Sequence, residues 1–253
     1  MSRAVLDACG CFPTGRHYAG IAHLLRSVAR GLLEDVAADA HWYDVPVALI
    51  DVETTGRDAS VDRVVEIGIA IGKGGVVVAR HNWLVNPGIP IPAEASAVHK
   101  ITDDDVKDKP RFEAIASEIA AALVGAIPAA YNAAFDKAFI TNEFARAGLR
   151  AESAPPFLRQ NVDWFDPLVW AREVHRSERS RALGDMAQLL GIKLDQAHRA
   201  SDDAEAALMV LYALAKDVRL PRPYGAFVQE QRRLGLAQAD ERRRYRMGSQ
   251  GRN

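Results

Sequence analysis

The residues best suited to chemistry are two carboxylates, Asp51 and Glu53, which stand two residues apart where an apolar run ends. The run from Val45 to Ile50 predicts a buried strand, and residues i and i+2 of a strand point to the same face. Two carboxylates held this close repel each other unless a cation lies between them. Mg²⁺ and Mn²⁺ prefer such oxygen ligands. The sequence therefore predicts a divalent-cation site here, with a solvated strand end as the alternative.

Two later stretches add carboxylates at predicted helix starts. Asp136 follows a short predicted strand, where an acid can also serve simply as a helix cap. Asp203 lies in the first turn of another predicted helix, five residues after His198. Ser201 or Asp202 can cap that helix, which leaves Asp203 free to face elsewhere. A lone histidine before a helix has no required role, so His198 becomes a candidate only together with the acids.

Taken together, these stretches resemble the motifs of the DEDDh 3′–5′ exonucleases, the family of the epsilon-type proofreading subunit of bacterial DNA polymerase III. The matching stretches are Asp51-Val-Glu53, Asn132-Ala-Ala-Phe-Asp136 and His198-Arg-Ala-Ser-Asp-Asp203. The resemblance spans about residues 45–216, and three ordered motifs are far more specific than one. It implies an α/β fold with an RNase H-like, mixed five-stranded sheet flanked by helices.

The resemblance also implies a role for each site residue. Asp51 would bridge two divalent cations, Mg²⁺ or Mn²⁺. Glu53 and Asp203 would hold the first cation, and Asp136 the second. His198 would be the general base that takes a proton from the attacking water. General chemistry supports this scheme, because two ions about 3.5–4 Å apart can stabilise the attacking and leaving oxygens, and a histidine can accept a proton near neutral pH.

The resemblance places three further residues at the substrate. Thr54 would lie at the terminal 3′-hydroxyl, and Val98 and His99 would line the sugar and base of the terminal nucleotide. A surface loop position is the alternative for His99. Two departures from the family pattern are visible: Tyr131 stands where many members have histidine, and Asp166 is followed by proline rather than threonine or serine.

Three functions compete. The favoured one is a metal-dependent exonuclease that releases 5′-nucleoside monophosphates from single-stranded or frayed DNA 3′ ends, either free-standing or as a subunit that proofreads for a DNA polymerase. The second is an RNA-trimming or oligoribonuclease-like enzyme with the same chemistry. The third is a nucleic-acid- or polymerase-binding module that has lost catalysis, against which the full set of acids and His198 argues.

The remaining pattern predicts the elements that would position these residues. Two β-rich runs around a glycine turn predict a hairpin over 64–71 and 76–85. Apolar spacing and cap residues predict the helices. These cover about 18–38, 111–124, 134–147, 167–174, 183–190 and 201–216, with short strands at 127–131 and 162–165 and a helix start at Thr102 or Asp103.

The chain divides into three parts on this basis: an N-terminal helical extension over 1–44, the exonuclease domain over 45–216, and a basic C-terminal tail over 217–253. The net charge of the whole chain is −1, so any attraction to nucleic acid must be local. The tail holds nine arginines against four acids, which predicts a flexible arm that contacts phosphates. A merely solvated charged face is the alternative.

Composition favours a cytoplasmic protein. The only cysteines, Cys9 and Cys11, lie too close together to join distant parts of a fold. No apolar run reaches membrane-spanning length, and the N-terminus lacks the apolar core of a signal peptide. We therefore expect no membrane partner.

Overall fold

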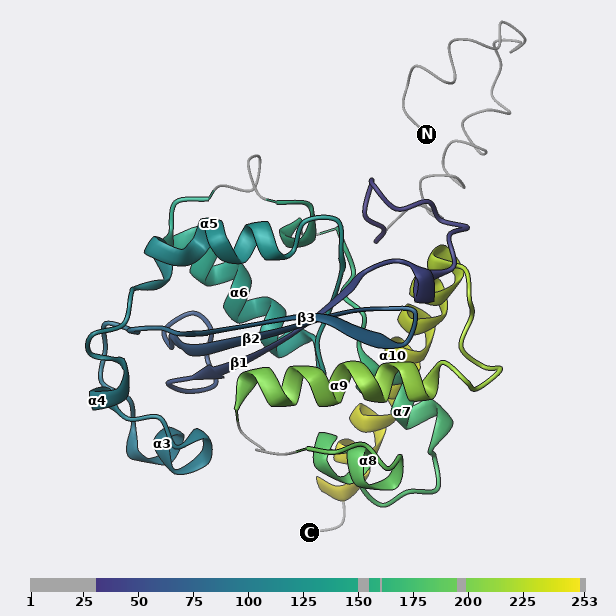
Figure 1. Ribbon diagram of the computed structural model, residues 1–253. Helices are drawn as coiled ribbons and strands as arrows, with labels where there is room; N and C mark the ends of the chain where they lie inside the picture. Colours follow the sequence, from purple (N-terminus) through teal and green to yellow (C-terminus); the bar gives the residue numbers. More distant parts are fainter. Residues whose placement is uncertain (1–30, 150–154, 160, 195–198, 251–253) are drawn as a thin grey trace, which may run out of the picture. The chain divides into compact units, whose positions relative to one another are not determined.

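The computed structural model describes residues 31–149, 155–159, 161–194 and 199–250. The chain from Gly31 onward forms one compact unit, which is built around a mixed sheet with helices on both faces (Figure 1). Its strands are β1 (Val47–Thr54), β2 (Val64–Lys73), β3 (Val76–Leu84) and β4 (Ile127–Ala129), in the order β3-β2-β1-β4. The predicted hairpin is confirmed as the antiparallel pair β2 and β3, and β4 runs parallel to β1.

The sheet has four strands in the described part of the chain, so the expected number of five is wrong. The segment expected as the last strand, residues 162–165, makes only isolated bridges, from Val162 to Gly31 and from Phe165 to Ala129. Gln231 takes up hydrogen-bonding groups next to this segment: its Nε2 donates to the Trp164 carbonyl at 2.9 Å, and the Asp166 amide donates to its Oε1 at 2.8 Å. The backbone of Phe165 pairs with β4, donating to the Pro128 carbonyl and accepting from the Ala130 amide, but this pairing does not extend into a continuous ladder.

The two faces of β1 belong to different cores. Val47 and Leu49 pack with α9, whereas Ala48, Ile50 and Val52 pack with α5 and α6. This alternation follows from the period of two in a strand, and Figure 1 shows α5 and α6 on one side of the sheet and α9 on the other. The helices concerned are α5 (Phe112–Ala122), α6 (Ala134–Arg146), α7 (Pro167–Val174) and α9 (Ala200–Leu214).

The C-terminal part of the chain is a long helix, α10 (Tyr224–Gln250), where the sequence predicted a flexible arm. Tyr224, Phe227 and Val228 on its first turns are fully buried, and Leu234 is 3% exposed. The Phe227 ring centroid lies 4.0 Å from that of Phe165. The reason for the error is that these apolar residues recur at helical spacing within a segment dominated by its arginines, and their burial orders the helix.

Several shorter elements differ from expectation. The helix expected over 18–38 lies outside the described residues up to position 30, and residues 31–38 form turns rather than a helix. Helix α3 (Ala93–His99) was not predicted, because prolines precede it. Helix α4 (Asp103–Val106) begins as expected after Thr102, whose amide donates to Asp105 Oδ2 at 2.8 Å. The others are α8 (Leu183–Leu189) and two short 3₁₀ turns, Trp42–Asp44 and Pro156–Leu158.

None of the helices in the described ranges combines the length and apolar character needed to cross a bilayer.

The packing of α10 predicts that it stabilises the fold. Phe227→Ala should lower the free energy of unfolding by about 3–5 kcal/mol, the usual cost of removing a buried aromatic ring. Leu236→Ala is the matched control on the same helix, because Leu236 is 74% exposed and its loss should change stability by under about 0.5 kcal/mol. Denaturant unfolding measures both. Equal effects of the two variants would contradict the buried position of α10.

Candidate active site

Three of the predicted acids come together at one end of the sheet. Asp51 and Glu53 continue the face of β1 that Val47 and Leu49 present to α9, and Asp203 lies in the first turn of α9. One carboxylate oxygen from each of Asp51, Glu53 and Asp203 can be chosen so that all three lie within 4.8 Å of one another. A set of hard oxygen donors at this spacing is suited to a divalent cation. We call Asp51, Glu53 and Asp203 the carboxylate cluster.

A glycine on the neighbouring strand allows α9 to approach. Gly68 pairs with Asp51 across β1 and β2, and a Cβ atom on Gly68 would lie 2.1 Å from the backbone carbon of Ala200. Ala200 is the first residue of α9. Only glycine therefore lets the start of this helix rest on the sheet directly beside Asp51, which is what brings Asp203 into the cluster.

Glu66 fixes the same junction and was not predicted as a site residue. It is fully buried on β2, opposite Glu53, and it accepts hydrogen bonds from Arg199 Nη2 at 2.7 Å and from the Ala200 amide at 3.2 Å. The carboxylate thus ties down the residue that precedes α9 and the first amide of the helix. The sequence signal that could have found it is an acid within the otherwise apolar run of β2.

Asp136 reaches the site from the other layer. It is 3% exposed near the start of α6, and its Oδ1 accepts a hydrogen bond from the Val52 amide at 3.1 Å. That amide is accessible because β4 pairs with β1 only as far as Leu49. Asp136 is not within the 4.8 Å set, but its charge acts on Asp51, whose pKa it helps to raise.

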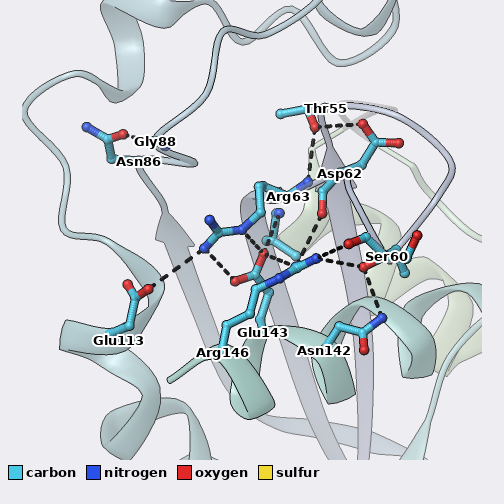
Figure 2. Close-up of polar contacts among 12 residues, drawn as sticks. Thr55, Ser60, Asp62, Arg63, Asn86, Gly88, Glu113, Asn142, Glu143 and Arg146 are labelled. Carbon is cyan, nitrogen blue, oxygen red and sulfur yellow. Dashed lines mark hydrogen bonds and ion pairs between the residues drawn. The ribbon is translucent and has the colours of Figure 1, made fainter. Parts of the chain in front are cut away.

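A buried ion-pair network holds α6 against the loop that follows β1 (Figure 2). Glu143, 1% exposed, accepts from Arg63 Nε at 2.7 Å and from Arg146 Nη1 at 3.2 Å. Arg146 Nη2 also donates to the carbonyls of Ala59 and Ser60, each at 2.9 Å. The helix that carries Asp136 is therefore fixed to the middle of the loop between β1 and β2 and to the end of that loop next to β2.

Burial and mutual repulsion raise the pKa of the clustered acids. Burial, followed by the charges of Asp136, Asp203 and Glu53, raises the pKa of Asp51 well above its usual range. Burial likewise raises the pKa of Asp136. For Glu53, burial and the charge of Asp203 raise the pKa to about 7. A divalent cation would supply positive charge that offsets the repulsion between these carboxylates.

The predicted substrate-binding residues lie in different surroundings. Thr54 is 8% exposed at the end of β1, and its hydroxyl donates to the Gly56 carbonyl at 2.6 Å. His99, expected as a possible surface residue, is buried, and its Nδ1 accepts from the Ile101 amide at 3.1 Å. Val98 is half-exposed beside it on α3. The predicted base, His198, lies outside the described residues.

The two departures from the family pattern both have structural partners. The Tyr131 hydroxyl donates to the Arg181 carbonyl at 2.6 Å. Asp166 caps α7 and also accepts from the Asn132 amide at 3.0 Å and the Ala133 amide at 3.2 Å. Asn132 has a φ of +71°, a left-handed conformation that asparagine tolerates better than most residues. Asp166 therefore holds the tight turn that leads into α6 and Asp136.

The family comparison agrees with this geometry. Residues 48–211 match the family model described as Exonuclease, RNase_T. The chain belongs to this exonuclease family. The match covers every acid of the cluster and Asp136, and it confirms the resemblance inferred from the three motifs.

Known relatives of the family include the PolC-type DNA polymerase III of Bacillus cereus, 33% identical over 170 residues, which are 67% of this chain and 11% of the relative. The PolC-type enzyme of Oceanobacillus iheyensis is 31% identical over 224 residues, or 84% of this chain and 15% of the relative. The chain thus spans only a small fraction of these polymerases.

Solved structures show the same fold. Exonuclease X in complex with 5′-overhanging duplex DNA has a TM-score of 0.56 at 21% identity and covers 72% of this chain and 98% of its own. The zinc-bound complex of E. coli exonuclease I with single-stranded DNA has a TM-score of 0.58 at 19% identity and covers 68% of this chain and 41% of its own.

The raised pKa values predict an effect of pH on stability. A carboxyl whose pKa is raised by folding favours the folded state below its unfolded pKa, and this stabilisation is lost as pH rises through the folded pKa. For Glu53, the window runs from 4.5 to about 7, and the loss is on the order of 3 kcal/mol. Without metal, stability should therefore fall between about pH 5 and 7.

Added Mg²⁺ or Mn²⁺ should restore the lost stability by neutralising the cluster, so the difference in melting temperature between metal and EDTA should grow with pH. Thermal unfolding at pH 5.5 and 8 tests this, with Glu53→Gln as the variant that reduces the pH dependence. A metal effect that is the same at both pH values would contradict a cation site in the cluster.

Proposed function

We propose that this chain is a metal-dependent 3′–5′ exonuclease that acts on single-stranded or frayed DNA ends. The observation that carries the proposal is the convergence of Asp51, Glu53 and Asp203 within 4.8 Å inside an exonuclease-family domain. A binding module that has lost catalysis would have no need to keep these acids so close together. The DNA preference is supported by the named relatives, which are DNA polymerases and DNA-bound exonucleases.

The residues present fit a pair of divalent cations, Mg²⁺ or Mn²⁺. Asp51 would contact both ions, with Glu53 and Asp203 at the first and Asp136 at the second. The fit rests on the donor set: hard carboxylate oxygens, buried and with raised pKa values. When bound, the cations would lower the pKa of the attacking water and neutralise charge that develops on the phosphate.

The chain's own residues would do the rest. His198 would accept the proton of the attacking water, the bond from phosphorus to the 3′-oxygen of the preceding nucleotide would break, and a 5′-monophosphate would leave. Arg199, the neighbour of His198 in sequence, is fixed by Glu66 beside the cluster, which supports this role. Thr54 at the end of β1 would contact the terminal 3′-hydroxyl, with Val98 and His99 at the terminal nucleotide.

The relatives named PolC-type polymerase also support a role beside a DNA polymerase, in which the domain would remove mispaired ends. A duplex end must be unpaired before one nucleotide can enter such a site, at a cost of a few kcal/mol. Frayed or mismatched ends avoid part of this cost and would be cleaved first.

The roles proposed for Asp51 and His198 predict that variants at these two positions differ in Mn²⁺ binding. Asp51→Asn should abolish both nuclease activity and tight Mn²⁺ binding, because this carboxylate would serve both ions. His198→Ala should lower turnover by about 10²–10⁴-fold, the usual contribution of a general base, and keep Mn²⁺ binding. Gel assays of turnover and calorimetric titration of Mn²⁺ separate the two. Near-normal turnover by folded Asp51→Asn protein would refute the proposed mechanism, and loss of Mn²⁺ binding in His198→Ala would make His198 a ligand.

Polarity is tested with 5′-labelled DNA and RNA oligomers of the same sequence, ending in a 3′-hydroxyl or a 3′-phosphate. A ladder that shortens from the hydroxyl end is expected, faster on single-stranded DNA than on blunt duplex or RNA. The 3′-phosphate should block it, because a charged group would replace the hydroxyl near Thr54. Cuts within the chain, or equal rates on the blocked end, would mean that the site does not recognise a terminus.

A further inference from the structure

An arginine-rich cleft lies between α7, the segment that follows α7, and α10, with a volume of about 1340 Å³. Its lining includes six arginines and only two glutamates. The arginines are Arg172, Arg176, Arg179, Arg181, Arg233 and Arg242. The sign of this charge is opposite to that of the carboxylate cluster, so the cleft is a second, separate feature.

Part of this positive charge is not neutralised by an ion pair among the described residues. Arg176 pairs with Glu173 and Arg233 with Glu230, but across the described ranges no ion pair joins Arg172 or Arg242 to a carboxylate. Burial and the nearby charge of Arg242 lower the pKa of Arg172.

A third arginine of the cleft, Arg181, has a buried hydrogen-bond donor that no described residue satisfies. The Nε of Arg181 is buried without a hydrogen-bond partner among the described residues. Leaving a buried donor unpaired costs free energy. A bound anion would satisfy this donor and would also relieve the repulsion between Arg172 and Arg242.

The cleft borders the second acidic motif. Tyr131 and Asn132 are among its lining residues, and the Tyr131 hydroxyl donates to the Arg181 carbonyl. Asn132 stands four residues before Asp136, in the turn that Asp166 holds. A strand bound at the carboxylate site would therefore have this cleft as its neighbour.

The size of the cleft argues for an extended ligand. Pockets for small molecules usually measure about 300–1,000 Å³, and this cleft exceeds that range. Arginines spread over α7, the following segment and α10 suit a chain of several phosphates better than one compact anion.

We propose that the cleft binds the phosphodiester backbone of the same nucleic-acid strand whose 3′ end would be cleaved at the carboxylate cluster. The inference rests on the proposed function for the identity of the strand. Arg172 and Arg242 form the centre of the site, and the arginines around them extend it. The cleft contacts phosphates only, so it adds affinity without selecting sequence.

The test is binding of a fluorescein-labelled, single-stranded oligomer of about 20 nucleotides, by anisotropy in EDTA over a series of salt concentrations. Arg172→Ala and Arg242→Ala should each weaken binding and make the slope of log K against log salt shallower by about 0.7, the value for one phosphate contact on a single strand. Arg244→Ala is the matched control, because Arg244 is exposed on α10 and does not line the cleft. It should leave the slope unchanged.

Two further arms make the result specific. Arg172→Lys keeps the positive charge and should keep the slope, which separates the effect of charge from that of packing. If Arg172→Ala does not fold, Arg242→Ala alone is sufficient for the test. An oligomer of about three nucleotides should bind more weakly and with a shallower slope than the long strand, since it contacts fewer of the arginines in the cleft. Equal slopes for Arg242→Ala and Arg244→Ala would overturn the proposal. So would an Arg242→Ala effect confined to binding of inorganic pyrophosphate.

The outcome is independent of the nuclease assay, because binding in EDTA needs no turnover. Wild-type protein that binds the long strand through Arg172 and Arg242 but does not degrade it would refute the proposed function and leave the cleft as a binding site. Protein that degrades DNA but binds it equally well without these arginines would refute the cleft alone.

Discussion

Repulsion between buried carboxylates is the constraint on which this structure depends. The acids of the cluster come from different elements, Asp51 and Glu53 from β1 and Asp203 from α9, and each element must be held in place against that repulsion. The fold does so with three further acids that hold these elements by hydrogen bonds. Glu66 holds the start of α9, Glu143 holds α6 to the loop after β1, and Asp166 holds the turn before α6.

Each of these three supporting acids accepts hydrogen bonds from backbone amides, arginines or both. For Asp51 and Glu53, burial and the charges of neighbouring acids raise the pKa. The supporting acids hold the surrounding elements in place, and the repulsion within the cluster is what a bound cation would relieve.

The sequence predicted the positions of the clustered acids better than it predicted how the sheet ends. Asp51 and Glu53 share a face because strand periodicity is strict, and Asp203 was correctly placed at a helix start. The contribution of Gly68 and Glu66 could not be predicted, because it arises where α9 crosses β2, and the two are far apart in sequence. The prediction of a fifth strand was wrong for a similar reason. Gln231 of the distant helix α10 forms hydrogen bonds with the Trp164 carbonyl and the Asp166 amide. Residue 198 lies outside what the structure describes.

Helix α10 has a buried face and a face that lines the cleft. One face fills the interior through Phe227 and Tyr224, and the other presents Arg233 and Arg242 to the cleft. Because these sets of side chains do not overlap, charge on the outer face can be increased, removed or reversed without disturbing the interior. The charge presented to the cleft can therefore change over evolutionary time, or be altered by design, while the aromatic side chains that anchor α10 stay as they are.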